Sequence, residues 1–106
     1  MGNLIVHNGA NLPDITDIEV KRNGKTVAQQ SGIKIPNGGF SEPIPLEKGV
    51  YDVTATFKYP NGKTVTETKT VTITDDDDTQ CDFFQVPSEP KVCVPPNLKK
   101  NKQPYQ

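Results

Sequence analysis

The stretch that decides the fold is YDVTATFKYPNGKTVTETKTVTI, residues 51–73. Both of its halves alternate apolar and polar side chains, a pattern typical of β-strands with one buried face. Pro60, Asn61 and Gly62 separate the two halves, and these are residue types that tight turns prefer. The stretch therefore predicts a β-hairpin.

The loop length of this hairpin follows from the requirement that both strands bury one common face. A two-residue loop at Asn61-Gly62 would pair Phe57 with Thr66, and a one-residue change of register turns every side chain to the other face. A three-residue loop instead pairs Phe57 with Val65 and restores one apolar face. That face comprises Tyr51, Val53, Ala55, Phe57, Tyr59, Val65, Val71 and Ile73.

The turn residues suit this longer loop. Pro60 favours the first central position of a type I turn, and Gly62 favours the left-handed position of the bulge that follows it. One conflict remains, because the same register directs Glu67 and Lys69 toward the apolar face. Either this end of the hairpin projects beyond the core, or a second bulge intervenes.

An upstream hairpin is predicted around Asn-Gly at residues 23–24, since this dipeptide is a strong signal for a two-residue turn. The turn pairs Arg22 with Lys25 and therefore Val20 with Val27. Both valines are apolar, so turn chemistry and burial pattern agree, and we expect both side chains to be buried.

The remaining segments predict further short strands at residues 3–7, 33–35 and 40–46. Pro43 and Pro45 alternate in the last of these, and proline removes a backbone donor, so we expect an edge strand. Ten prolines and eight glycines disfavour long helices. The pattern predicts an all-β, immunoglobulin-like antiparallel sandwich of about seven strands over residues 1–75. An acidic linker and a proline-rich tail are expected over residues 76–106.

Residues 33–73 resemble the C-terminal half of bacterial immunoglobulin-like surface domains, including the CARDB-like group. The matching features are the turn at residues 36–39, the segment IPLEKGVYDV at residues 44–53, and the threonine-rich hairpin after it. The resemblance implies that Leu46 is a core residue before a turn at Gly49. It also implies that Tyr51 opens a strand at a place like that of the tyrosine corner.

The resemblance further implies a function: a stalk, spacer, adhesin or assembly module, usually extracellular and often in tandem. Such domains share no active residues. The chain contains no tryptophan, and both of its cysteines lie in its last quarter. The core Trp and the intersheet disulfide of antibody-type domains are therefore not expected.

The two cysteines, Cys81 and Cys93, allow one intrachain disulfide. Such a bond contributes about 3 kcal/mol for a loop of this size and indicates an oxidising compartment. Free thiols are the alternative. A metal site is not favoured, because His7 is the only histidine and lies far away in sequence.

The tail offers three alternatives: it is disordered, it packs back onto the sandwich through Phe83 and Phe84, or it reaches a neighbouring subunit. Its prolines favour an extended conformation, and an extended arm suits strand addition. The candidate contacts with a partner are Phe83, Phe84, Val86, Ile44, Thr66, Thr68 and Thr70.

Four consecutive carboxylates follow the last predicted strand: Asp75, Asp76, Asp77 and Asp78. A solvated acidic linker is the first interpretation. Calcium is the alternative, because Ca²⁺ takes six to eight oxygen ligands, although the spacing is not that of an EF-hand.

Threonines alternate along residues 64–74, and Thr54 and Thr56 join them from the neighbouring strand. All are expected to face away from the core. Strand propensity alone accounts for this pattern. A regular hydroxyl array for ice or a polymer, or a surface that packs against another subunit, are the alternatives.

The composition narrows the function classes. The net charge of −1 provides no cationic field for nucleic acid or an anionic membrane. No segment approaches the roughly 20 apolar residues of a membrane span, and none resembles a signal peptide. Either a leader has been removed or the product starts in the cytosol, as a virion protein would.

No serine stands in a nucleophile-elbow pattern with His7, and no carboxylate pair stands out, so an enzyme is not expected.

The leading hypothesis is a non-enzymatic structural or interaction module of a cell-surface, fibre, filament or virion protein. It would bind protein partners or its own copies through edge-strand and tail contacts, in an extracellular location. The alternative is a non-catalytic carbohydrate-binding module that uses Ca²⁺ at residues 75–78. A protease inhibitor that presents the Cys81–Cys93 loop is a further hypothesis.

Overall fold

The computed structural model describes residues 1–9, 13–83 and 93 of the chain. These residues form seven β-strands, and no helix occurs among them. The strands are β1 (Gly2–Asn8), β2 (Asp14–Arg22), β3 (Lys25–Gln30), β4 (Ile44–Leu46), β5 (Gly49–Lys58), β6 (Thr64–Ile73) and β7 (Asp78–Phe83).

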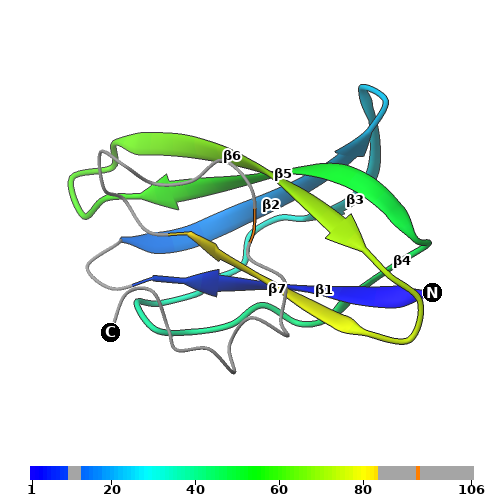
Figure 1. The fold of residues 1–106 in the computed structure, drawn as a ribbon. Helices are drawn as coiled ribbons and strands as arrows, with labels where there is room; N and C mark the ends of the chain where they lie inside the picture. Colours follow the sequence, from blue (N-terminus) through cyan, green and yellow to red (C-terminus); the bar gives the residue numbers. More distant parts are fainter. Residues whose placement is uncertain (10–12, 84–92, 94–106) are drawn as a thin grey trace.

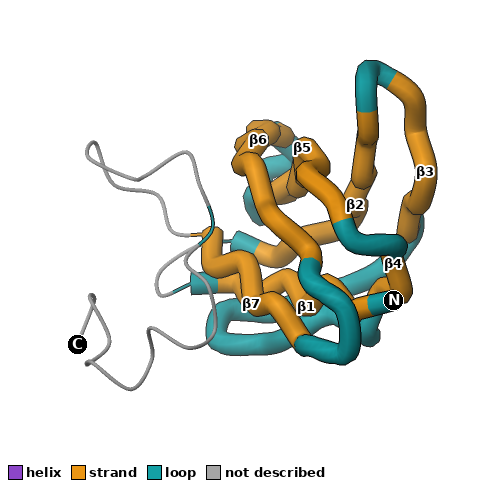
Figure 2. Tube along the Cα trace, turned by 45° about the vertical axis from the view of Figure 1, so that its right-hand side comes forward, coloured by secondary structure: helices purple, strands orange, loops and turns teal. Residues whose placement is uncertain are grey.

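The strands form two stacked sheets (Figures 1 and 2). One sheet has the order β3-β2-β5-β6 and is antiparallel throughout. The other has the order β4-β1-β7, in which β1 is antiparallel to β4 and parallel to β7. Constant-type immunoglobulin domains place their first, second, fourth and fifth strands in one sheet. Here the first and fourth strands share a sheet with the seventh instead, and the first strand lies between the other two.

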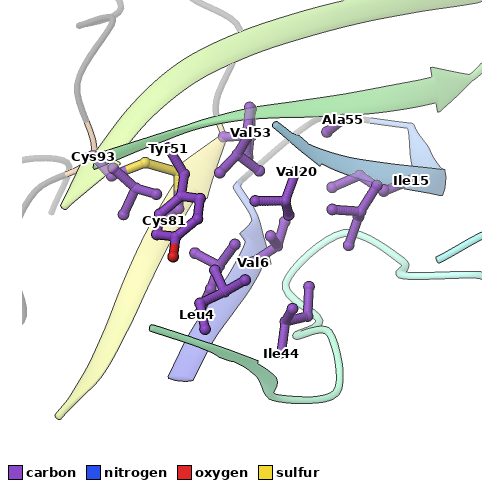
Figure 3. Close-up of a cluster of buried hydrophobic side chains, with 14 of the residues drawn as sticks. Leu4, Val6, Ile15, Val20, Ile44, Tyr51, Val53, Ala55, Cys81 and Cys93 are labelled. Atoms are coloured by element: carbon purple, nitrogen blue, oxygen red, sulfur yellow. A yellow bond between two sulfur atoms is a disulfide. The ribbon is translucent and has the colours of Figure 1, made fainter. Parts of the chain in front are cut away.

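Every strand except β3 contributes to a single hydrophobic core between the sheets (Figure 3). Inward and outward side chains alternate along β1, β5 and β7, as expected for sheets with one buried face. The largest fully buried side chains are Phe57 and Phe83, whose rings meet edge to face with centroids 6.2 Å apart. This geometry is a favoured arrangement for aromatic pairs.

The hairpin of β5 and β6 has the predicted register, with Phe57 opposite Val65. The amide of Gly62 donates to the carbonyl of Tyr59 at 2.9 Å, and the amide of Tyr59 donates to the carbonyl of Lys63 at 2.8 Å. Gly62 has φ +89°, in the left-handed region. The bulged three-residue turn is therefore confirmed.

The conflict at Glu67 and Lys69 is resolved without a second bulge, because the register of β5 and β6 is continuous. Lys69 is buried on the core side, with only 3% of its surface exposed. Its ammonium donates to the carbonyl of Asp82 and lies 5.2 Å from the centroid of the Phe83 ring. A backbone acceptor and a ring face therefore compensate the buried charge.

The hairpin of β2 and β3 follows the prediction at its turn but not beyond it. Arg22 pairs with Lys25, as expected. The register then shifts, so that Val20 lies opposite Ala28 rather than Val27. The expectation that Val27 is buried is wrong: it is the extra residue of a β-bulge on β3 and is 49% exposed.

The edge-strand prediction for residues 40–46 is confirmed, since β4 lies at the outer edge of its sheet. The strand is shorter than expected and covers only Ile44–Leu46. Residues 33–35 form no strand; Ile35 makes an isolated bridge to Ile15. The predicted boundary at residue 75 leaves out β7, whereas the structure places Asp78–Phe83 in the three-stranded sheet beside β1.

Tyr51 makes the contact expected of a tyrosine corner. Its hydroxyl donates to the carbonyl of Glu47, four residues upstream, at 2.6 Å. The Arg22 guanidinium lies 5.3 Å from the Tyr51 ring centroid. Gly49, with φ +152°, leaves room for the Arg22 side chain, because a Cβ at this position would lie 2.8 Å from Arg22 Nη2. Leu46, the other residue of this prediction, is buried in the core.

Candidate functional site

Cys93 joins the two sheets along one side of the sandwich. It forms a disulfide with Cys81 of β7, and its amide donates to the carbonyl of Thr70 in β6 at 2.9 Å. Both cysteines belong to the buried core (Figure 3). The predicted disulfide is therefore present, and it connects the edge strands of both sheets. We call this the closed side.

The structure places two of the predicted contact residues in the core. Phe83 is fully buried at the end of β7, which agrees with the alternative in which this part of the tail packs back. Ile44 is 4% exposed and faces the interior from β4, so neither side chain is accessible to a partner. Phe84 and Val86 lie outside the described residues.

The acidic run forms the turn between β6 and β7 rather than a linker. Three of its carboxylates face different partners. Asp75 accepts a hydrogen bond from the Met1 amino group at 3.0 Å, Asp77 from Thr74 and Asp78 from Asn3. The Met1 contact lowers the pKa of Asp75 and raises the pKa of the Met1 amino group, through the hydrogen bond first and the charge second.

These contacts spread the carboxylates of the turn. In the described part of the chain, no three His, Cys, Asp or Glu side chains are grouped as a metal ion would require. Asp76 has a left-handed backbone, with φ +64°. Calcium binding at Asp75–Asp78 stays a prediction.

The threonines lie on the outer face of the four-stranded sheet, as predicted. Thr66 and Thr68 are exposed and Thr70 is half-buried. The hydroxyls of Thr54 and Thr68 hydrogen-bond across the strands at 2.8 Å, and that of Thr70 donates to Asp52 at 3.3 Å. Part of the hydroxyl array is thus satisfied within the sheet itself.

The opposite side of the sandwich carries β3 and β4 at the sheet edges, and we call it the open side. Among the described strands, only β2 pairs with β3. Four of the six β3 residues are exposed, namely Lys25, Thr26, Val27 and Gln29. The β2–β3 hairpin also projects beyond the other strands (Figure 1). β4 is a poorer edge, because it has three residues and Pro45 at its centre lacks an amide hydrogen.

Asn8 organises one end of the sandwich, where β1 and β7 end and β2 begins. Its side-chain amide donates to the carbonyls of Pro13 and Ile35 at 2.8 and 2.9 Å. Its Oδ1 atom is buried, and no group among the described residues donates to it. We call this the loop end; it also carries the turn at residues 59–63.

An exposed aromatic side chain lies near the loop end. Phe40 is 56% exposed, and its ring stacks on that of His7 with centroids 4.3 Å apart. Asp82 Oδ1 lies 3.1 Å from His7 Nδ1 and accepts from Gln80 at 2.7 Å. His7 is thus held between a ring and a carboxylate.

The loop end also contains a pocket with a volume of about 400 Å³. It is lined by Pro13, Asp14, Thr16, Lys58, Tyr59 and Pro60. The sequence placed Tyr59 on the core face with Tyr51 and Phe57. The structure places only the latter two in the core; Tyr59 is half-buried and lines the pocket. Cross-strand alternation could not reveal this, because Tyr59 lies just beyond the last residue of β5.

Comparison with known proteins adds no relative: no family model matches the chain, and neither a curated protein nor a solved structure is similar to it. Within the described residues, no helix is long and apolar enough to cross a bilayer. The functional argument therefore depends on the geometry described above.

Proposed function

We propose that this chain is a non-enzymatic interaction module that binds a protein partner, or a second copy of itself, by strand addition at the β3 edge. In this proposal it is an immunoglobulin-like sandwich in the broad sense, with two packed sheets but its own strand order. It would serve in a cell-surface, fibre, filament or virion protein.

The observation that supports this proposal is the contrast between the sheet edges. An edge strand presents unpaired amide and carbonyl groups that another strand can join. β6 and β7 are linked through Cys93, and β4 is short with a central proline. Among the four edge strands that the structure describes, β3 combines exposure and the absence of proline with no link through Cys93.

Two features of β3 restrict where a partner strand can add. Lysines and bulges are devices that protect edges from indiscriminate pairing. Lys25 and the bulge at Val27 both lie in the half of β3 next to the turn. Addition is therefore expected along the regular half, which pairs with β2 from Ala28 to Gln30.

Two further contributions complete the proposal. Tail contacts beyond Cys93 would form a second contact surface on the closed side, because the disulfide fixes Cys93 there. An extracellular location is supported by the same disulfide, since such bonds persist in oxidising compartments.

The test compares two exposed valines of the same sheet. Val27 lies on the edge and is 49% exposed, whereas Val50 lies on β5, inside the sheet, and is 58% exposed. The mass of the full chain is measured by sedimentation over a range of concentrations. We expect concentration-dependent association that Val27→Lys abolishes, because it places a second edge lysine directly beside the regular half of β3, and that Val50→Lys leaves unchanged.

A peptide with the β3 sequence, residues 25–30, serves as a second probe. It should bind the wild-type chain and fail to bind Val27→Lys. A chain that stays monomeric at every concentration and binds no such peptide would contradict the proposal. Equal loss of association in both valine variants would also contradict it, since the edge would then have no special role.

A further inference from the structure

The pocket at the loop end is assembled by three separate features: a bulge in β2, the turn after β5 and a hydrogen bond from the Asn8 side chain. A bulge in β2 shifts the register between Ile15 and Asp17, and the extra residue, Thr16, lines the pocket. Bulges redirect side chains and are over-represented near functional sites. The register beyond this bulge sets Asp14 of β2 opposite Lys58 of β5.

The walls of the pocket are held by backbone hydrogen bonds. The turn bonds of Tyr59 to Lys63 and of Gly62 to Tyr59 fix one wall, at Tyr59 and Pro60. The Asn8 side chain fixes the opposite wall through its 2.8 Å bond to the Pro13 carbonyl. A preformed pocket loses little conformational entropy when a ligand binds.

The chemistry of the lining is mixed in a specific way. Pro13, Tyr59 and Pro60 provide ring surfaces, while Asp14 and Lys58 provide one acceptor and one donor group. Thr16 donates its hydroxyl to Asp17 at 2.8 Å, which leaves its oxygen as a further acceptor. The volume, about 400 Å³, falls within the range of small-molecule sites.

These properties select among ligand classes. A wholly apolar ligand would desolvate Asp14 and Lys58 without replacing their hydrogen bonds. Lys58 would attract an anion, but Asp14, whose Oδ2 lies 4.0 Å from the Lys34 Nζ, would repel it. A saccharide offers C–H faces for the rings and hydroxyls that both donate to a carboxylate and accept from an ammonium.

We propose that this pocket is a saccharide-binding site, in which a sugar ring packs on Tyr59 and Pro60 and its hydroxyls bond Asp14 and Lys58. This site is separate from the β3 edge and does not depend on partner binding there. It lies at the end of β6 that follows the turn at residues 59–63, whereas Asp75–Asp78 follow the other end. Binding is therefore independent of calcium.

The experiment titrates the full chain with glucose, galactose, mannose and N-acetylglucosamine separately, and follows backbone amide shifts by NMR with and without a chelator. We expect at least one sugar to shift the amides of residues 14–16 and 58–59, equally in both conditions. Tyr59→Ala and Asp14→Asn should each weaken its binding about tenfold or more.

Matched controls separate the pocket from the rest of the surface. Phe40→Ala removes an exposed ring that does not line the pocket, and Asp52→Asn removes a carboxylate of the outer sheet face. Both should leave the affinity unchanged. Tyr59→Phe keeps the ring and should bind within about threefold of wild type, which covers the case in which Tyr59→Ala does not fold.

Several results would overturn the proposal. They are the absence of amide shifts at the pocket with all four sugars, shifts centred on residues 75–78 that the chelator abolishes, and unchanged affinity in folded Asp14→Asn. Shifts at the pocket with free glycine but with none of the sugars would assign it to a zwitterion instead. Association through β3 is measured independently, so either proposal can fail alone.

Discussion

The two sides of the sandwich solve the problem of unpaired sheet edges differently. On the closed side, Cys93 hydrogen-bonds to β6 and is covalently linked to β7. On the open side, β3 and β4 end their sheets with no such link among the described residues. The bonds at Cys93 tie the edge strands of the closed side together, and we expect them to stabilise that side more than the open side, whose edges stay available for a partner.

The largest effect is expected for Phe83→Ala on the closed side. Phe83 is fully buried, meets Phe57 edge to face and lies under the Lys69 ammonium. Its truncation should lower the free energy of unfolding by about 3–5 kcal/mol. Denaturant titration measures this loss. A loss below about 1 kcal/mol would mean that the closed side is not the stable one.

Removing the disulfide should have the next largest effect. Cys81 and Cys93 are 12 residues apart, so Cys93→Ser should cost about 3 kcal/mol of unfolding free energy. The same loss is expected for the wild-type chain under reducing conditions, measured by thermal or chemical denaturation. The reductant should leave Cys93→Ser unaffected. If Cys93→Ser were as stable as the oxidised wild-type chain, the disulfide would not stabilise the domain.

Two valines compare the sides directly. Val71 on β6 is fully buried, whereas Val27 on β3 is about half exposed. Val71→Ala should lower the free energy of unfolding by about 2 kcal/mol or more, and Val27→Ala should lower it by less than about 0.5 kcal/mol. Equal losses in urea titrations would remove the distinction between the sides.

The smallest effect is expected at the turn of the closed side, where Asp75 pairs with the Met1 amino group. The pKa of the Asp75 carboxyl is lowered in the folded chain. Its contribution to stability is therefore present above the unfolded pKa and is lost as the pH falls through the folded pKa. The amino pKa is raised above 8.0, so that contribution is lost as pH rises past the folded value. When the melting temperature is plotted against pH at low salt, Asp75→Asn should reduce both the fall at acidic pH and the fall at alkaline pH. High salt should have the same effect on wild type.

Local sequence patterns predicted much of the fold. The pairing of Phe57 with Val65 follows from alternation and from the chemistry of Pro60 and Gly62, because only one loop length unites the apolar faces. The same reasoning failed at Val27, since a bulge has no clear signature when both candidate partners are small and apolar.

Long-range pairing was not visible in the sequence. β7 lies parallel to β1, and Leu4 pairs with Thr79 across the length of the domain. β7 begins at the last of four consecutive aspartates and is short, with mixed polar and apolar residues, so the sequence predicts a tail there and not a strand. The pocket was missed for a similar reason: Asp14, Lys58 and Tyr59 meet only once β2 and β5 pair around a bulge.

The parallel pairing of β1 and β7 has a mechanical consequence. A force that pulls Met1 and Phe83 apart runs along both strands in opposite directions, so it shears all six residue pairs of Asn3–Asn8 with Asp78–Phe83 at once. Such a joint resists extension better than one that opens pair by pair. While the disulfide is intact, tension applied beyond Cys93 enters β7 directly at Cys81 and bypasses residues 82–92. The oxidised chain should therefore transmit tension as a short, stiff link, and reduction should lengthen it before the sandwich yields.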